Sequence, residues 1–173
     1  MELTKNIINN SKLIKSALFV LIGTALLAIS SKIQTPFTLV PATMQTFVVM
    51  FIGITLGHKL ATLTVLLYLI EGSFGLPVFA KGGGIGYLLG PTGGYLIGFI
   101  FASFFAGYMN LNTNFFVIFF KLIFSVSIIY IMGILWLGNL IGWEKPVFEL
   151  GAKPFLLAEL FKISLLTIIT KGI

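Results

Sequence analysis

Long apolar runs, separated by short polar or glycine-rich stretches, dominate the pattern of hydrophobic and polar positions along this chain. Each run predicts a membrane-spanning helix, since about 20 apolar residues cross the hydrocarbon core of a bilayer. Two of the runs are short, and Gly57-His58-Lys59 between them predicts a tight turn. We expect one integral membrane domain over residues 1–173, with spans at about 13–31, 42–56, 59–72, 92–109, 115–138 and 154–171.

The composition agrees with this pattern and excludes several kinds of chemistry. The chain is 58% hydrophobic and 9% charged, whereas soluble domains carry about 25% charged residues. We therefore predict an all-α membrane protein with six transmembrane helices. Cysteine, aspartate and arginine are absent, so no Ser/His/Asp or Cys/His arrangement can be built, and we expect neither an enzyme nor a disulfide. One histidine makes a metal site improbable, and the net charge of +6 comes from scattered lysines, which does not favour nucleic acid as a partner.

The first apolar run also has a second interpretation. Lys12 and Lys15 precede the run at 16–30, and Ala28-Ile29-Ser30 resembles the cleavage site of a signal peptide. We favour a retained helix because further spanning segments follow.

An even number of spans places both termini on one side of the membrane. The proline-containing loop at 32–41, the glycine-rich loop and the loop at 138–153 then share the opposite face. Lysines on the terminal side outnumber those on the loop side: Lys5, Lys12, Lys15, Lys59 and Lys171 against Lys32, Lys81, Lys145 and Lys153. The positive-inside rule therefore predicts cytoplasmic termini in the cell membrane.

The stretch at 74–94, FGLPVFAKGGGIGYLLGPTGG, lies between two apolar runs and holds eight glycines and two prolines. It cannot be one continuous helix. Irregular backbone near a bilayer is tolerated where protein buries it or where it lines a cavity, so we expect the wall and lid of a ligand pocket. The stretch has neither the GK[ST] ending of a P-loop nor a GxGxxG pattern, so we expect no nucleotide site in this chain, and any energy source would be an ion gradient or another subunit.

Glu159 and Lys162 lie inside the last apolar run, three residues apart and hence on one helix face. A charge near the bilayer centre costs about 2.5–3.5 kcal/mol, and such groups normally face a cavity or each other. A ligand site is favoured over a pair that only fixes packing. Thr43 and Gln45 open the second run at a matching depth, although Gln45 serves equally well as an interhelical hydrogen bond. Lys162 suits a carboxylate, whereas Glu159 and Gln45 suit a ureido or amide ligand.

Three blocks of the chain resemble a known family: TPFTLVPATMQTF (35–47), YLIEGSFGLPVFAKGGGIGYLLGPTGGYLIGF (68–99) and PFLLAELFK (154–162). They are similar to the BioY family, the biotin-specific substrate-binding (S) components of energy-coupling factor (ECF) transporters. The resemblance implies a six-helix S-component fold that captures biotin from outside and works with a transmembrane coupling subunit and two ATPase subunits. No cofactor is implied.

The resemblance also implies site residues. Family features fall on Gln45, on the glycine-rich loop and on the third block, where the family usually has aspartate at the position of Glu159. Lys162 would pair with a charged or polar end of biotin, Glu159 would accept ureido hydrogen bonds, and two tyrosines would cover the rings. With Thr43 from the depth argument, the expected ligand-binding residues are Thr43, Gln45, Gly84, Gly86, Tyr87, Thr92, Gly93, Tyr95, Glu159 and Lys162.

S components usually dock their coupling subunit through small residues at four-residue spacing on the first helix. Ala17, Thr24 and Ala28 form such a stripe here, interrupted by Leu21. The sequence leaves two other functions open. One is a stand-alone, gradient-driven carrier of small solutes with Glu159 and Lys162 as an ion relay, and the other is a structural membrane subunit.

Overall fold

The structure, a computed structural model, describes the backbone of residues 2–35, 39–110 and 112–172, and side chains from Lys12 onward within these ranges. Its secondary structure is helical, and in these ranges the extended pairing is limited to two isolated bridges, Gln34 with Thr43 and Phe79 with Gly82. The elements in order are α1 (Glu2–Lys32), α2 (Gln45–Ser73), α3 (Ile85–Leu88), α4 (Gly93–Tyr108), α5 (Phe115–Ile141), α6 (Val147–Gly151), the 3-10 turn η1 (Lys153–Phe155) and α7 (Leu156–Gly172).

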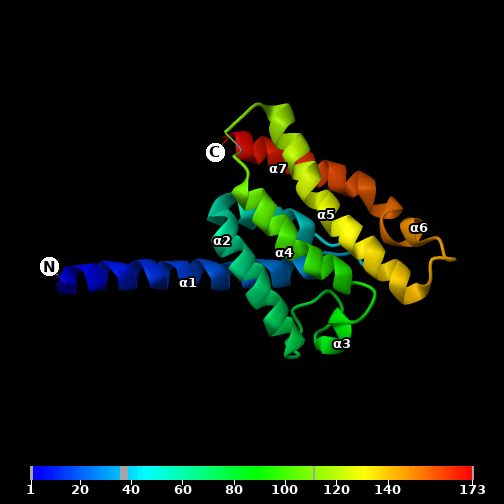
Figure 1. The fold of residues 1–173 in the computed structure, drawn as a ribbon, viewed down its shortest axis with the longest axis horizontal. Helices are drawn as coiled ribbons and strands as arrows, with labels where there is room; N and C mark the ends of the chain where they lie inside the picture. The colour runs from blue at the N-terminus through cyan, green and yellow to red at the C-terminus, as the bar shows by residue number, and fades with distance from the viewer. Residues whose placement is uncertain (1, 36–38, 111, 173) are drawn as a thin grey trace.

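Helix α2 is two helical segments joined by a sharp bend at Gly57. This residue has φ 74° and ψ 164°, which lies outside the helical region and suits glycine. Figure 1 shows the chain changing direction there, so that the residues before and after the bend form separate rods. The break predicted between the two runs is confirmed at Gly57, whereas His58 and Lys59 of the predicted turn are already helical.

Three helices of the described chain are long and apolar enough to cross a membrane: Lys12–Lys32 of α1, Gln45–Ser73 and Phe115–Ile141. Helix α4 is apolar but has 16 residues. Large apolar side chains cover the outside of the bundle, among them Phe116 at 72% exposure and Leu157 at 82%. Such a surface matches lipid tails rather than water, so the chain is an all-α membrane protein.

Small residues bring α4 close to both of its neighbours. A Cβ atom on Gly53 of α2 would lie 2.8 Å from Cβ of Ala106, and one on Gly98 would lie 2.8 Å from Cα of Ile129 in α5. Without a hydrophobic drive between helices in lipid, close backbone approach is what stabilises such contacts. Helix α4 therefore forms the centre of the bundle, with α2 and α5 against it.

The irregular segments gather at one end of the bundle. Figure 1 shows both termini on the left, whereas the loop with α3 and the loop with α6 lie toward the opposite end. Several details differ from the predicted elements: α1 already begins at Glu2, α5 continues to Ile141, and the four-residue helix α3 forms inside the glycine-rich loop. A short helix, α6, forms inside the predicted loop at 138–153, and Pro154 lies in η1, so that the final helix begins at Leu156.

Candidate ligand-binding site

Glu159 and Lys162 form a buried ion pair at the start of α7. The Nζ atom of Lys162 lies 2.7 Å from Oε1 of Glu159, and the two side chains are 9% and 6% exposed. Glu159 is in the first turn of the helix, where the positive end of the helix dipole favours a carboxylate. The predicted sharing of one helix face is confirmed.

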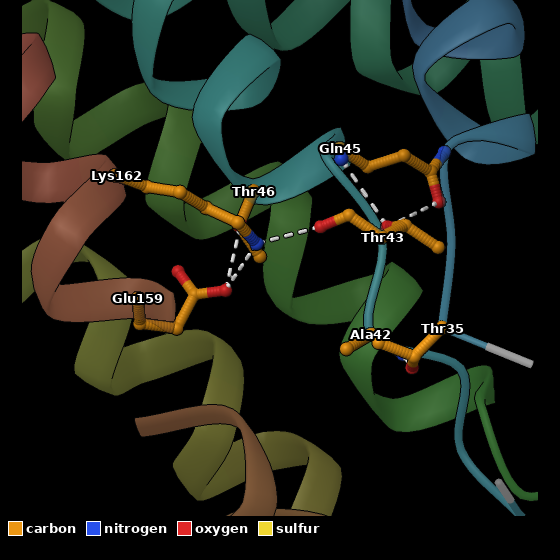
Figure 2. Close-up of polar contacts among 7 residues, drawn as sticks. All are labelled: Thr35, Ala42, Thr43, Gln45, Thr46, Glu159 and Lys162. Atoms are coloured by element: carbon orange, nitrogen blue, oxygen red, sulfur yellow. Dashed lines mark hydrogen bonds and ion pairs between the residues drawn. The ribbon is translucent and has the colours of Figure 1, made fainter. Parts of the chain in front are cut away.

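The ammonium group of Lys162 has three acceptors within the protein. Besides Glu159, it donates to the backbone oxygen of Thr43 at 2.6 Å and to Oγ1 of Thr46 at 3.1 Å. Figure 2 shows the ammonium reaching from α7 across to the start of α2. An ammonium has three donors, so its hydrogen bonding is complete without a ligand. Its position ties α7 to α2.

Thr46 links the two charged side chains and was not among the residues predicted from sequence. Its hydroxyl donates to Oε1 of Glu159 at 2.9 Å while it accepts from Lys162. Its position, one residue after Gln45 and three after Thr43, could have marked it as a site candidate. The sequence does not tell, however, which side of the first turn of α2 meets α7.

Gln45 belongs to a second polar network that points toward α1. Its amide nitrogen donates to the hydroxyl of Tyr68 at 2.6 Å and to the backbone oxygen of Leu27 at 3.4 Å. The hydroxyl of Thr43 lies 3.3 Å from Oε1 of Gln45 and also accepts from the Gln45 backbone N–H. Figure 2 shows the Gln45 side chain turned away from Glu159, so Thr43 is the residue that joins both networks.

A small cavity of about 50 Å³ lies beside these networks. It is bounded by the start of α2, the glycine-rich loop, α4, α5 and the segment leading into α7. The lining residues are Val40, Pro41, Ala42, Thr43, Gln45, Thr46, Ala80, Tyr87, Thr92, Tyr95, Leu96, Phe99, Ile129, Tyr130, Phe155 and Glu159. Pockets for drug-sized ligands span about 300–1,000 Å³, so a ligand of that size requires this cavity to widen.

Six of the ten predicted ligand-binding residues line the cavity: Thr43, Gln45, Tyr87, Thr92, Tyr95 and Glu159. Lys162 lies behind Glu159 rather than in the lining. Gly84, Gly86 and Gly93 are also outside the lining. Gly84 has φ 98° and precedes α3, and a Cβ atom on Gly93 would lie 1.8 Å from the backbone oxygen of Leu88, so both glycines shape the loop.

Aromatic rings from three elements face the cavity. Tyr95 donates its hydroxyl to the backbone oxygen of Gly151 at 2.8 Å and meets Tyr130 edge to face, with ring centroids 6.1 Å apart. Tyr87 stacks on Phe79 at 5.1 Å. Burial raises the pKa of the Tyr87 phenol, which is therefore neutral at physiological pH. These rings offer apolar faces to a flat ligand. Tyr130 was not predicted, since nothing in an apolar helix sequence singles it out.

A larger hollow of about 480 Å³ runs between α5 and α7. Apolar side chains line most of it, including Ile134, Leu156 and Ile163. Tyr130 and Glu159 line both this groove and the small cavity. The second carboxylate oxygen of Glu159, Oε2, is buried and has no hydrogen-bond partner in the described chain. A buried carboxylate oxygen without a donor is costly, and it offers an acceptor to a ligand.

The three small residues predicted to dock a partner do not share one exposed face. Ala17 is exposed, Ala28 is half-buried against the core, and Thr24 is buried at 4% exposure with its hydroxyl donating to the Leu21 backbone oxygen. In this structure Thr24 faces the bundle. Among the three residues of the stripe, Ala17 is therefore the exposed one.

Comparison with known proteins places this geometry in a family. The family model described as "BioY family" matches residues 4–173. "Probable biotin transporter BioY" of Pyrococcus horikoshii is 38% identical over 156 residues, which cover 90% of this chain and 91% of the relative. "Biotin transporter BioY" of Thermotoga maritima is 36% identical over 154 residues, 88% of this chain and 89% of the relative.

A solved structure has the same fold. The crystal structure of the S-component for biotin from an ECF-type ABC transporter aligns with a TM-score of 0.79 and 26% sequence identity, covering 94% of this chain and 92% of that chain. The fold is therefore that of an S component. With the family match over nearly its full length, this chain belongs to the BioY family.

Proposed function

We propose that this chain is the biotin-binding S component of an ECF transporter, which captures biotin from outside and delivers it inward. The observation that carries the proposal is the buried carboxylate of Glu159, a residue that lines the cavity beneath the glycine-rich loop and whose oxygen Oε2 has no hydrogen-bond partner in the described chain. The names of the relatives and of the solved S component support biotin as the ligand.

The chemistry of the site suits a ureido bicycle. Glu159 would accept ureido N–H groups at Oε2, since its other oxygen is already taken by Thr46 and Lys162. The rings of Tyr87 and Tyr95 would cover the apolar part of the ligand, and Thr43 and Gln45 would complete the polar wall.

Lys162 would act in one of two ways that experiment can separate. As it stands, the ammonium bonds both to the carboxylate of Glu159 and to the backbone oxygen of Thr43 at the start of α2. If it pairs directly with an end of biotin, the ligand replaces one of its three protein acceptors. The predicted partnership of Lys162 with biotin therefore requires that its ammonium give up one of these acceptors, together with the widening that the 50 Å³ cavity needs.

The proposed partners are a transmembrane coupling subunit and two cytoplasmic ATPase subunits. From Leu13 onward, helix α1 presents exposed apolar side chains, including Leu18 at 55% and Leu21 at 55%, beside the accessible Ala17. Such a surface suits another membrane helix. We propose cytoplasmic termini in the cell membrane, in accordance with the lysine distribution. Energy would come from ATP hydrolysis on the partners.

The test is calorimetric titration of biotin into the purified chain, with thiamine and riboflavin as controls. Saturable heat with biotin alone supports the proposal. Absence of heat with all three vitamins overturns it and favours a structural subunit. Purified protein in liposomes addresses the carrier alternative, because uptake driven by a pH gradient without any ATPase would show that the chain works alone.

A further inference from the structure

The end of α1 holds three successive backbone carbonyls of the loop that follows α2. Oγ of Ser31 lies 2.8 Å from the oxygen of Val78 and 2.7 Å from that of Ala28, so its one hydroxyl proton is shared between these two acceptors, and Nζ of Lys32 donates to the oxygen of Phe79 at 2.6 Å. Just beyond the helix, Nε2 of Gln34 donates to the oxygen of Ala80 at 3.0 Å. We call these three side chains the α1 clamp. These bonds join residues that are 46 or 47 positions apart in the sequence, so they attach the loop to a distant element of the fold.

The clamped segment is a wall of the candidate site. Ala80 lines the small cavity, and Phe79 is fully buried and stacks on Tyr87, which also lines it. Tyr68, which accepts from Gln45, donates to the oxygen of Val78 at 3.0 Å. The clamp therefore attaches to the same short segment that carries cavity-lining groups.

The far end of the loop has its own anchor. Nε1 of Trp136 in α5 donates to the backbone oxygen of Gly90 at 2.9 Å. Between the two anchors, Gly82 and Gly84 have φ of 132° and 98°, and Tyr87 lies in α3. Tyr87 thus belongs to a stretch held at both ends, and its place over the cavity depends on both attachments.

Lys32 is the charged member of the clamp and lies outside the cavity. Its residue is exposed and does not occur in the cavity lining. A hydrogen bond from an ammonium to a carbonyl is about twice as strong as a neutral one. Ordering the exposed side chain of Lys32 costs conformational entropy. The hydrogen bond offsets this cost because it joins α1 to the buried segment that forms one wall of the cavity.

We infer that Lys32 is a positioning residue for the ligand cavity: through the α1 clamp it sets ligand affinity without touching the ligand. The inference rests on the proposed function, since biotin is the probe. It also makes α1, which extends out of the bundle on the left of Figure 1, an element whose displacement alters the binding wall.

The test compares Lys32→Met, Lys32→Arg and the control Lys153→Met by biotin calorimetry on the full chain. Lys153 is an exposed lysine whose ammonium bonds to Glu149, and neither of these two residues lines the cavity. We expect Lys32→Met to weaken biotin binding about tenfold, Lys32→Arg to stay within about threefold, and Lys153→Met to match the parent. Lys32 lies on the membrane face opposite the termini. Removing its positive charge therefore leaves the excess of lysines on the terminal side, and the expected orientation in the membrane is kept.

A second measurement reports on the clamp without ligand. Trp136 and Trp143 are the two tryptophans of the chain, so Trp143→Phe leaves Trp136 as the one indole reporter. In that background we expect Lys32→Met to raise amide hydrogen exchange at residues 78–90 and to shift Trp136 emission, while Lys32→Arg does neither. Parental affinity and parental exchange in Lys32→Met would overturn the inference. A lower unfolding temperature with unchanged affinity would also overturn it, since that result marks a merely structural contact. If the parent protein does not bind biotin, the proposed function fails. The hydrogen-exchange measurement then tests by itself whether the α1 clamp holds the loop.

Discussion

Lys162 and Glu159 are joined by a 2.7 Å contact within one turn of α7, and neither side chain is more than a tenth exposed. A second pair, Lys153 with Glu149, has a similar length of 2.9 Å but exposures of 64% and 59%. Removing one partner of a buried pair leaves an uncompensated charge and costs about 3–5 kcal/mol. An exposed pair contributes about 0–1 kcal/mol. The two pairs therefore form a matched comparison within one protein.

Lys162→Ala should abolish tight biotin binding while the protein still inserts into the membrane. The substitution removes three hydrogen bonds and leaves Glu159 charged and buried without its counter-ion. Calorimetry should show at least a 100-fold loss of affinity, about 3 kcal/mol. Lys153→Ala serves as the control and should bind as the parent does. Equal binding by Lys162→Ala and the parent would refute the site assignment.

The length of the acidic side chain should matter less than its charge. Glu159→Asp moves the carboxylate back by one methylene and restores the residue that the family resemblance leads us to expect, so affinity should stay within about tenfold. Glu159→Gln keeps the length but replaces a charged acceptor by an amide and leaves Lys162 without its counter-ion. We expect a loss beyond about 100-fold. Calorimetric titration of biotin into both variants measures the order of their affinities. Tighter binding by Glu159→Gln than by Glu159→Asp would contradict the role of Oε2.

Thr46→Val should weaken biotin binding by about five- to tenfold. Valine fills the same space but removes the hydroxyl that bonds Glu159 at 2.9 Å and Lys162 at 3.1 Å, a loss of about 1 kcal/mol or more. Thr46→Ser keeps the hydroxyl and should retain most of the parental affinity. If Ser and Val variants bind equally, the hydroxyl bridge has no part in the site.

Gly72→Ala should lower thermal stability. A Cβ atom on Gly72 would lie 2.0 Å from Cζ of Phe79, whose ring is fully buried and in contact with Tyr68, so the ring must move. Overpacking of this kind costs about 1–3 kcal/mol. The measurement is the unfolding temperature in detergent. Gly172→Ala, where a Cβ atom meets nothing within 4 Å, is the control and should unfold as the parent does. An unchanged temperature for both variants contradicts the packing described.

Local signals in the sequence were enough to predict much of this fold. The bend at Gly57 followed from a glycine in a polar turn between two apolar runs, and the shared face of Glu159 and Lys162 followed from helix periodicity. Both depend on neighbours within a few residues. The same holds for the glycine-rich loop, whose composition excludes a continuous helix.

Relations between distant elements could not be predicted in the same way. The rotation of α2 about its axis decides that Thr46 meets α7, whereas Gln45 turns to Tyr68. Likewise, Tyr130 looks like any residue of an apolar helix, and it reaches the cavity because Gly98 lets α4 pack closely on α5. Such contacts depend on tertiary packing, which a single sequence does not specify by pattern.

The two hollows share a partition that is one layer of side chains thick, formed by Tyr130 and Glu159. Any alkyl tail that fills the outer groove contacts this partition from the lipid side. The choice of detergent should therefore affect the measured affinity for biotin, because a detergent molecule in the groove and a vitamin in the cavity contact the same two residues. Affinities measured in nanodiscs of differing acyl length should reveal that competition.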